Sequence, residues 1–242
     1  MPSSGVLRQL SFRPRLGPTL VTVPLLLALL GLGAWQVARL QEKNAINAYR
    51  AQRAAEAPVD LPADPGDLAA FDFHRVRVHG RFAHERELYM YGRSQRGNDG
   101  YYLITPLIRD NGPPVLINRG WVPTDHKAPA TRPESEPAEP VTVTAFLRQD
   151  ARHGWLMPDN DPARNAWFWF DLPAMSKAAG LDPPATFYLE ADATPNPAGL
   201  PVGGQTQIAL PSPHLQYAIT WFALAIGLIV IYVVWHKQAE RG

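Results

Sequence analysis

Residues 212–235 read SPHLQYAITWFALAIGLIVIYVVW, and no Asp, Glu, Lys or Arg occurs anywhere between Asp192 and Lys237. At about 1.5 Å of rise per residue, a helix over residues 215–235 is about 31 Å long, which matches the hydrocarbon core of a bilayer. A core helix of a soluble domain does not need that length without a charge. We therefore predict a transmembrane helix over residues 214–235, with His214 in its first turn.

A second charge-free segment runs from Leu16 to Ala38 and is also long enough to span a bilayer. Basic residues precede it, so a cleaved signal peptide is an alternative interpretation. The apolar run exceeds that of a usual signal peptide, however, and it continues without a small-residue cleavage site into Trp35 and Arg39. This pattern favours a retained anchor over residues 16–38. Residues 39–57 are expected to continue as a helix until Pro58.

The cations that flank the second span predict the orientation. None lies in the twenty residues before it, whereas Lys237 and Arg241 follow it. By the positive-inside rule, residues 1–15 and 236–242 form cytoplasmic or matrix-side tails, and residues 39–213 form an extracytoplasmic domain, periplasmic in a bacterium. The short segment before the first span leaves little room for a transit peptide. We therefore expect the inner (plasma) membrane of a bacterium rather than the mitochondrial inner membrane.

The composition excludes several function classes. The chain has 242 residues and a formal net charge of +1, which argues against a general nucleic-acid binder. It has no cysteine, so disulfides, thiol catalysis and cysteine-ligated metals are excluded. Its 25 prolines and 18 glycines indicate many turns and short strands between the two spans.

The region between the spans reads as consecutive short strands. Residues 73–82 alternate with a period of two, and a turn at Asp110–Gly112 joins two further strands into a hairpin. The other expected elements are strands at 87–91, 141–148, 167–170, 186–190 and 205–210, a helix at 172–179, a linker at 58–67 and a loop at 123–140. Short connections favour an antiparallel sheet that curls toward a barrel. The predicted fold is thus a membrane protein with two terminal transmembrane helices flanking an extracytoplasmic α+β domain.

His214 is the leading candidate for a functional residue. Ser212 is a good helix N-cap and Pro213 a good first helical residue, which places His214 in the first turn. A helix N-terminus disfavours added positive charge, so the imidazole is biased toward its neutral, metal-ligating form.

Two alanines, Ala218 and Ala225, lie below His214 on the same face of the helix, together with Tyr217 and Trp221. Small residues there allow a flat ligand, such as a porphyrin bound through His214, or another backbone to approach closely. The alternative is an interfacial histidine in an aromatic belt that packs on the first helix.

Three weaker candidates each have an ordinary structural explanation. The basic stripe of Arg75, Arg77, His79 and Arg81 suits haem propionates, anionic lipid or an acidic partner, but is more typical of the wet face of a sheet. Trp155, Trp167 and Trp169 suit a ligand cleft, but are more typical of a core. His153 with Asp159, Asp161 and Asp171 offers metal ligands, but in a stretch where Asx turns are the default. No nucleophile, zinc-hydrolase or phosphate-loop signature is present, so we do not expect an enzyme.

Six segments resemble the Surfeit locus protein family of cytochrome c oxidase assembly factors, in that family's order. They are residues 33–40 with Lys43, 73–82, 100–107, 118–123, 201–204 and 214–221. Each segment is weak alone, but six in order between two terminal spans are specific. The family commonly has Asn just before the histidine of the second span, whereas Ser212 and Pro213 precede His214 here.

The resemblance implies a membrane-anchored assembly factor for a haem-copper terminal oxidase. It implies that His214 binds haem a through its iron, and that the protein assists haem a binding or delivery to cytochrome c oxidase subunit I. Haem A synthase and the lipid bilayer are the other partners implied. The alternative is a purely structural scaffold that stabilises oxidase subunits without touching cofactor. That scaffold predicts an effect of Arg119→Ala on oxidase assembly but none of His214→Ala.

Overall fold

The computed structural model describes residues 14–93, 97–149 and 153–239. The chain divides into two compact units, residues 1–48 with 210–242, and residues 49–209. The predicted tails lie largely outside the described residues. Helices α1 (Leu16–Ala55) and α3 (His214–Ala239) are both long and apolar enough to cross a membrane. This confirms the two terminal helices, and α1 continues beyond residue 38 as its composition predicted.

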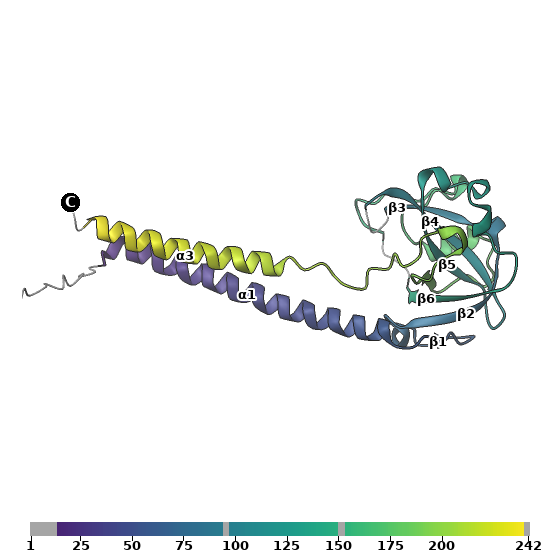
Figure 1. Cartoon of the computed structure of the whole chain (residues 1–242), viewed down its shortest axis with the longest axis horizontal. Helices are drawn as coiled ribbons and strands as arrows, with labels where there is room; N and C mark the ends of the chain where they lie inside the picture. Colours follow the sequence, from purple (N-terminus) through teal and green to yellow (C-terminus); the bar gives the residue numbers. More distant parts are fainter. Residues whose placement is uncertain (1–13, 94–96, 150–152, 240–242) are drawn as a thin grey trace, which may run out of the picture. The chain divides into compact units, whose positions relative to one another are not determined.

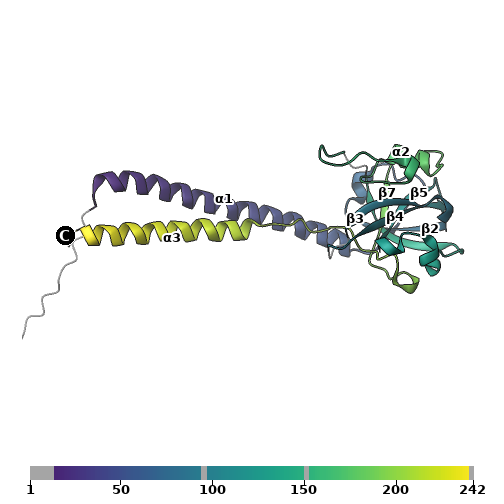
Figure 2. The ribbon, with the colours of Figure 1, turned by 90° about the horizontal axis from the view of Figure 1, so that it is seen from above.

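In the first unit α3 lies beside the first part of α1 (Figures 1 and 2). Polar contacts join the helices near both ends of the pair. Asn47 donates to the carbonyl of Leu210 at 3.0 Å and accepts from its N–H at 2.9 Å. Thr19 and Tyr232 share a hydroxyl hydrogen bond of 2.5 Å. The helices therefore form an antiparallel pair, with one polar contact between them near Tyr232 and another that ties the segment before α3 to α1.

The second unit is built on a closed five-stranded barrel. Its strands, in order around the barrel, are β2 (Arg75–Phe82), β6 (Val141–Arg148), β7 (Tyr188–Ala191), β5 (Val115–Pro123) and β4 (Asp99–Arg109), which pairs again with β2. Two more strands extend this sheet: β1 (Val59–Asp60) pairs parallel with β2, and β3 (Leu88–Arg93) pairs antiparallel with β4. Short 3-10 turns cover Leu68–Phe71, His84–Arg86, Thr124–His126, Pro129–Thr131, Pro133–Ser135, Pro162–Arg164 and Pro197–Gly199.

The predicted barrel is confirmed, but its sheet is mixed. Four neighbouring pairs in the barrel are antiparallel, and β5 pairs parallel with β7, Leu116 opposite Tyr188. Strand directions cannot alternate all the way around a ring with an odd number of members. A five-stranded barrel therefore needs at least one parallel pair, which the expectation of an antiparallel sheet did not anticipate.

Strand alternation divides the apolar residues of the barrel domain between two cores. Ile117 and Leu189 belong to one cluster with residues of β2, β4 and β6, whereas their neighbours Leu116 and Tyr188 belong to the other. The second cluster includes residues of the short helix α2 (Leu172–Ala178), which lies beside β5 and β7 in Figure 2. The strands β5 and β7 are thus covered on both faces.

Three local predictions were wrong. Residues 167–170 are not a regular strand, because Trp167 makes only a two-bond bridge with β3 and the N–H of Phe168 then donates to the Asn160 side chain. Residues 205–210 form no strand. Conversely, the expected linker 58–67 contains β1, since Leu61 is buried and its N–H donates to the Arg77 carbonyl at 2.8 Å.

Gly120 permits a close backbone crossing. Its φ is +130°, and a Cβ placed on it would lie 2.3 Å from the carbonyl oxygen of Val202. The next residue, Trp121, exchanges two backbone hydrogen bonds with Val202, at 2.9 and 2.8 Å. Only glycine fits such a position. The segments 118–123 and 201–204, both part of the family resemblance, therefore meet here.

Candidate functional site

His214 is the first residue of α3. The N–H of Tyr217 donates to the carbonyl of Pro213 at 3.2 Å, so Pro213 rather than Ser212 stands at the cap position. The Ser212 hydroxyl is buried and has no hydrogen-bond partner in the described chain. The predicted serine cap is therefore wrong by one residue, although the position of His214 in the first turn is as expected.

The imidazole of His214 contacts a side chain that sequence analysis did not single out. Its Nδ1 lies 2.7 Å from Oε1 of Gln36 on α1. Gln36 is 9% exposed, one of three buried residues of α1 with Leu29 and Gly33. Their spacing of four and three residues places them on one helix face. This face packs against α3.

The alanine face of α3 is also part of this helix packing. Ala218 and Ala225 are 3% and 2% exposed. Across the interface, a Cβ on Gly33 would lie 2.6 Å from the ring of Phe222. Of the two neighbours that the alanines allow, a flat ligand or another backbone, the neighbouring helix occupies this face. Tyr217 by contrast is 52% exposed.

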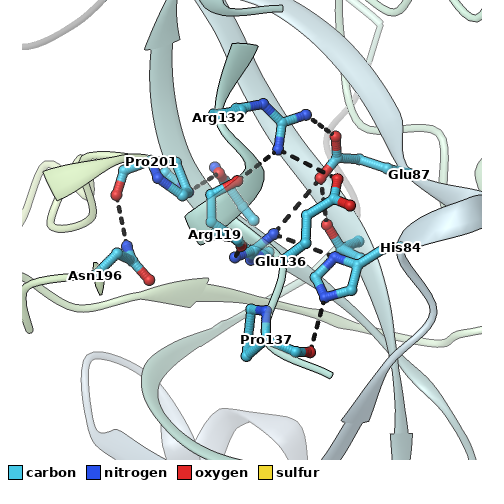
Figure 3. A network of polar contacts seen from close by, with 12 residues as sticks. His84, Glu87, Arg119, Arg132, Glu136, Pro137, Asn196 and Pro201 are labelled. Atoms are coloured by element: carbon cyan, nitrogen blue, oxygen red, sulfur yellow. Dashed lines mark hydrogen bonds and ion pairs between the residues drawn. The ribbon is translucent and has the colours of Figure 1, made fainter. Parts of the chain in front are cut away.

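A buried charge cluster lies in the barrel domain, as Figure 3 shows. Glu87 stands between two arginines: one carboxylate oxygen accepts from Arg132, and the other lies 3.6 Å from Arg119 and accepts from Thr105 at 3.0 Å. The side chains of Glu87, Arg119 and Arg132 are 1%, 3% and 1% exposed. We call Glu87, Arg119 and Arg132 the buried triad.

The buried triad anchors the loop after β5. Arg132 donates to the hydroxyl of Ser135 at 2.9 Å and to the carbonyl of His126 at 3.1 Å, and Arg119 donates to the carbonyl of Ser135. The predicted loop 123–140 is therefore fixed from within, although its sequence is rich in proline and acidic residues. This arrangement is structural, because each member of the buried triad is satisfied by protein groups.

Burial controls the electrostatics around the triad. It lowers the pKa of Arg119 to about 10, and the carboxylate of Glu87 opposes this shift. Burial, and then the charge of Arg119, also lowers the pKa of His84 below its ordinary 6.5. Arg119 remains charged at neutral pH, whereas His84 is held neutral.

The basic stripe on β2 is the wet face of the sheet. Arg77 pairs with Asp60 at 2.9 Å, His79 contacts Asp110, and Arg81 donates to the carbonyl of Ala138. The intervening Val76 and Val78 are buried in the barrel. The ordinary explanation of the stripe is confirmed for Arg77, His79 and Arg81, whereas Arg75 is half-buried and lies 3.9 Å from Asp192.

The tryptophans divide between core and surface. Trp167 is fully buried, as predicted, and Trp169 is half-buried. Trp155 is 88% exposed, so its expected place in the core was wrong. It is followed by exposed Leu156 and Met157 in a loop that lies outside the described strands.

The aspartates near His153 are turn and cap residues. Asp161 accepts from the N–H of Arg164 at 3.2 Å, and Asp171 caps α2 through the N–H of Ala174 at 3.0 Å. No group of three potential metal-ligating side chains occurs among the described residues. A structural role in place of metal ligation is thus confirmed for Asp161 and Asp171, although both are helix caps and not Asx turns.

The sequence pattern singled out His214, which stays a prediction, but it did not single out Gln36 or the buried triad. A signal existed for Gln36, because it is an amide within a long apolar segment, and such residues inside a membrane span are commonly functional. No comparable signal distinguished Glu87 from an ordinary acidic residue at the start of a strand.

The fold defines a class of protein in which a small barrel domain is flanked in the sequence by two helices. Both helices are long and apolar enough to cross a membrane. The chain belongs to the SURF1 family, whose model matches residues 23–226. Members of this family are known as cytochrome oxidase assembly factors. The resemblance that the six sequence segments carried is therefore confirmed.

Several relatives cover most of the chain. Surfeit locus protein 1 of Rattus norvegicus is 35% identical over 226 residues, which are 87% of this chain and 72% of the rat protein. Surfeit locus protein 1 of Homo sapiens is 34% identical over 228 residues, covering 88% and 74% of the two chains. The SURF1-like protein of Drosophila melanogaster is 33% identical over 229 residues, covering 87% and 74%.

Proposed function

We propose that this protein is a membrane-anchored assembly factor for a haem-copper terminal oxidase, and that His214 binds haem a before its delivery to subunit I. Family membership supports the role in oxidase assembly. The observation that carries the haem role is the contact of His214 with Gln36, because it leaves one ring nitrogen available. The protein acts by binding, not by catalysis, and its barrel domain lies on the extracytoplasmic side of the inner membrane.

The residues present fit a haem group. Haem iron is commonly held by one imidazole nitrogen. Nδ1 of His214 is engaged by Gln36, and Nε2 makes no contact with a polar group of the described chain. Leu215 and Ile219, in the first turns of the same helix, are more than half exposed and offer apolar surface.

The chain would contribute orientation and a single donor atom. Nε2 of His214 would hold the iron of a bound haem, and the iron would supply the Lewis-acid centre. Gln36 holds the ring of His214 in place, and Gly33 lets the helices approach closely enough for this contact. One donor atom suits delivery, because release from His214 then requires the breaking of one metal–ligand bond.

The test compares wild type with His214→Ala in a host that makes haem a. We expect haem a absorption from the purified wild-type protein, its loss in His214→Ala, and reduced oxidase activity when the variant replaces the native protein. A haem-free wild type, together with full oxidase activity in the variant, would overturn the haem role and favour the scaffold alternative.

A scaffold probe must avoid the buried triad. Arg119→Ala removes a buried cation and damages the fold, so it does not distinguish scaffolding from haem binding. Trp155→Ser is suitable, because its side chain is exposed and its loss leaves the core intact. A loss of oxidase assembly in Trp155→Ser but not in His214→Ala would favour a purely structural scaffold.

The orientation is tested with single cysteines, since the chain has none. Cysteine at Glu85, whose side chain is 69% exposed, is expected to react with a membrane-impermeant maleimide from the extracytoplasmic side. Cysteine at Lys237 is expected to react only after the membrane is opened. The reverse pattern would overturn the proposed topology.

A further inference from the structure

Gln36 is a buried amide on an otherwise apolar helix face. It lies one turn after Gly33 on the face of α1 that meets α3, and its neighbours there are small or apolar. A buried amide without a hydrogen bond is destabilising. The contact with His214 satisfies the carbonyl of this amide.

The contact determines which nitrogen of His214 carries a proton. The Gln36 atom nearest the ring is Oε1, 2.7 Å from Nδ1. A carbonyl oxygen only accepts hydrogen bonds, so a hydrogen bond in this contact places the hydrogen on Nδ1. Neutral imidazole has a single N–H, and its lone pair is therefore on Nε2. The opposite orientation of the amide would place the proton on Nε2 and block metal binding there.

We propose that Gln36 is a positioning residue for His214, which fixes the Nδ1–H tautomer and the ring orientation so that Nε2 faces an incoming haem iron. This inference rests on the proposed haem role. Histidines that bind metals commonly donate their other N–H to a protein acceptor, and the loss of that acceptor typically weakens metal binding by 10- to 100-fold. Gln36 supplies such an acceptor from the other helix.

The helix pair holds Gln36 in register with His214. Ala218 and Gly33 are small where the backbones of the two helices approach. Gln36 is thus held on a rigid element rather than a loop. A rigid helix of this kind keeps Oε1 of Gln36 within 2.7 Å of Nδ1 of His214.

Two substitutions separate the acceptor from the shape of the side chain. Gln36→Met keeps a similar length without a strong acceptor, and Gln36→Glu keeps an acceptor oxygen. Asn47→Leu is the matched control, because it removes a polar contact of the same helix without touching His214. The thermal unfolding of each full-length variant in the same detergent verifies that the helix pair is retained.

The first measurement uses the haem-free protein. Nitrogen-15 NMR of labelled histidines at pH 8 identifies the protonated ring nitrogen, and His214→Gln assigns the signal. We expect the Nδ1–H tautomer in wild type, Gln36→Glu and Asn47→Leu, and a large loss of it in Gln36→Met. An unchanged tautomer in Gln36→Met, or an equal loss in Asn47→Leu, would overturn the inference.

The second measurement is a titration with haemin, followed by absorbance. We expect binding to weaken by 10- to 100-fold in Gln36→Met and to stay near wild type in Gln36→Glu and Asn47→Leu. Equal affinity in wild type and Gln36→Met would overturn the positioning role while leaving the haem role intact. No binding by wild type would overturn the haem role itself, and the NMR result would still report whether Gln36 sets the tautomer.

Discussion

Replacing Glu87 by Gln should strongly destabilise the barrel domain. The substitution keeps the size and shape of the side chain, so it opens no cavity. It removes the only fully buried negative charge of the triad and leaves Arg119 and Arg132 facing each other. Glu136 remains as an acid 3.8 Å from Arg132, and it is partly exposed.

The magnitude follows from the contacts that are lost. With an effective dielectric constant of about 20, the charges of Glu87 and Arg119, 3.6 Å apart, attract by about 5 kcal/mol. The attraction between Glu87 and Arg132, which are closer together, adds to this energy. The neutral glutamine avoids the desolvation cost of a buried carboxylate, and this gain offsets much of the lost attraction. Removal of one partner from a buried ion pair typically costs about 3–5 kcal/mol, which is the loss we expect here.

The assay is urea unfolding of the full-length protein in mild detergent, followed by tryptophan fluorescence. The matched control is Glu85→Gln, two residues away and exposed, for which we expect a change within about 0.5 kcal/mol. The double variant Glu87→Gln/Arg132→Met should lose less stability than the sum of the single variants. A cost below about 1 kcal/mol in Glu87→Gln, or simple additivity in the double variant, would refute this electrostatic reasoning.

Three further predictions concern the barrel domain. Gly120→Ala should lower the free energy of unfolding by at least about 2 kcal/mol, because φ is positive and a carbonyl blocks the Cβ. Gly66→Ala, where φ is also positive but the surrounding space is open, should cost about 1 kcal/mol. Equal losses in urea unfolding would contradict this prediction. Trp167→Ala should cost about 3–5 kcal/mol and Trp155→Ala almost nothing, and comparable losses would refute the assignment of these residues to core and surface. Because the pKa of His84 is lowered in the folded state, the unfolded chain binds a proton at this imidazole more readily than the folded chain does. The free energy of unfolding should therefore fall as the pH drops below about 6.5. His84→Gln should flatten the slope of this free energy against pH, and an unchanged slope would contradict the lowered pKa.

Local sequence patterns predicted those parts of the fold that depend on nearby residues. The alternation of residues 73–82 gave the buried and exposed faces of β2, and the turn at residues 110–112 gave the β4–β5 hairpin. The absence of charge over long segments predicted α1 and α3. Each of these signals is contained within one element, so it is readable without knowledge of the partner strands.

Contacts between distant residues were not predictable in this way. Glu87 and Arg132 are 45 positions apart, and Gln36 and His214 are 178 apart. Whether a charged residue is solvated or buried depends on which strands close the barrel, and its own sequence neighbours do not encode that. The parallel pair β5–β7 was missed for the same reason, because it is a property of the closed ring.

The surroundings of His214 limit where a haem could bind to this protein. The sequence allowed either a flat ligand or a neighbouring helix against Ala218 and Ala225, and α1 occupies that face. A haem bound to this protein therefore cannot rely on the alanine face unless the helices separate. The atom left for it is Nε2 of His214, beside the exposed Leu215. Since the same helix contact that closes the alanine face also brings Gln36 to Nδ1, helix packing and ligand readiness depend on each other. A substitution that loosens the helix pair, such as Gly33→Leu, should thus impair haem binding without altering either His214 or Gln36.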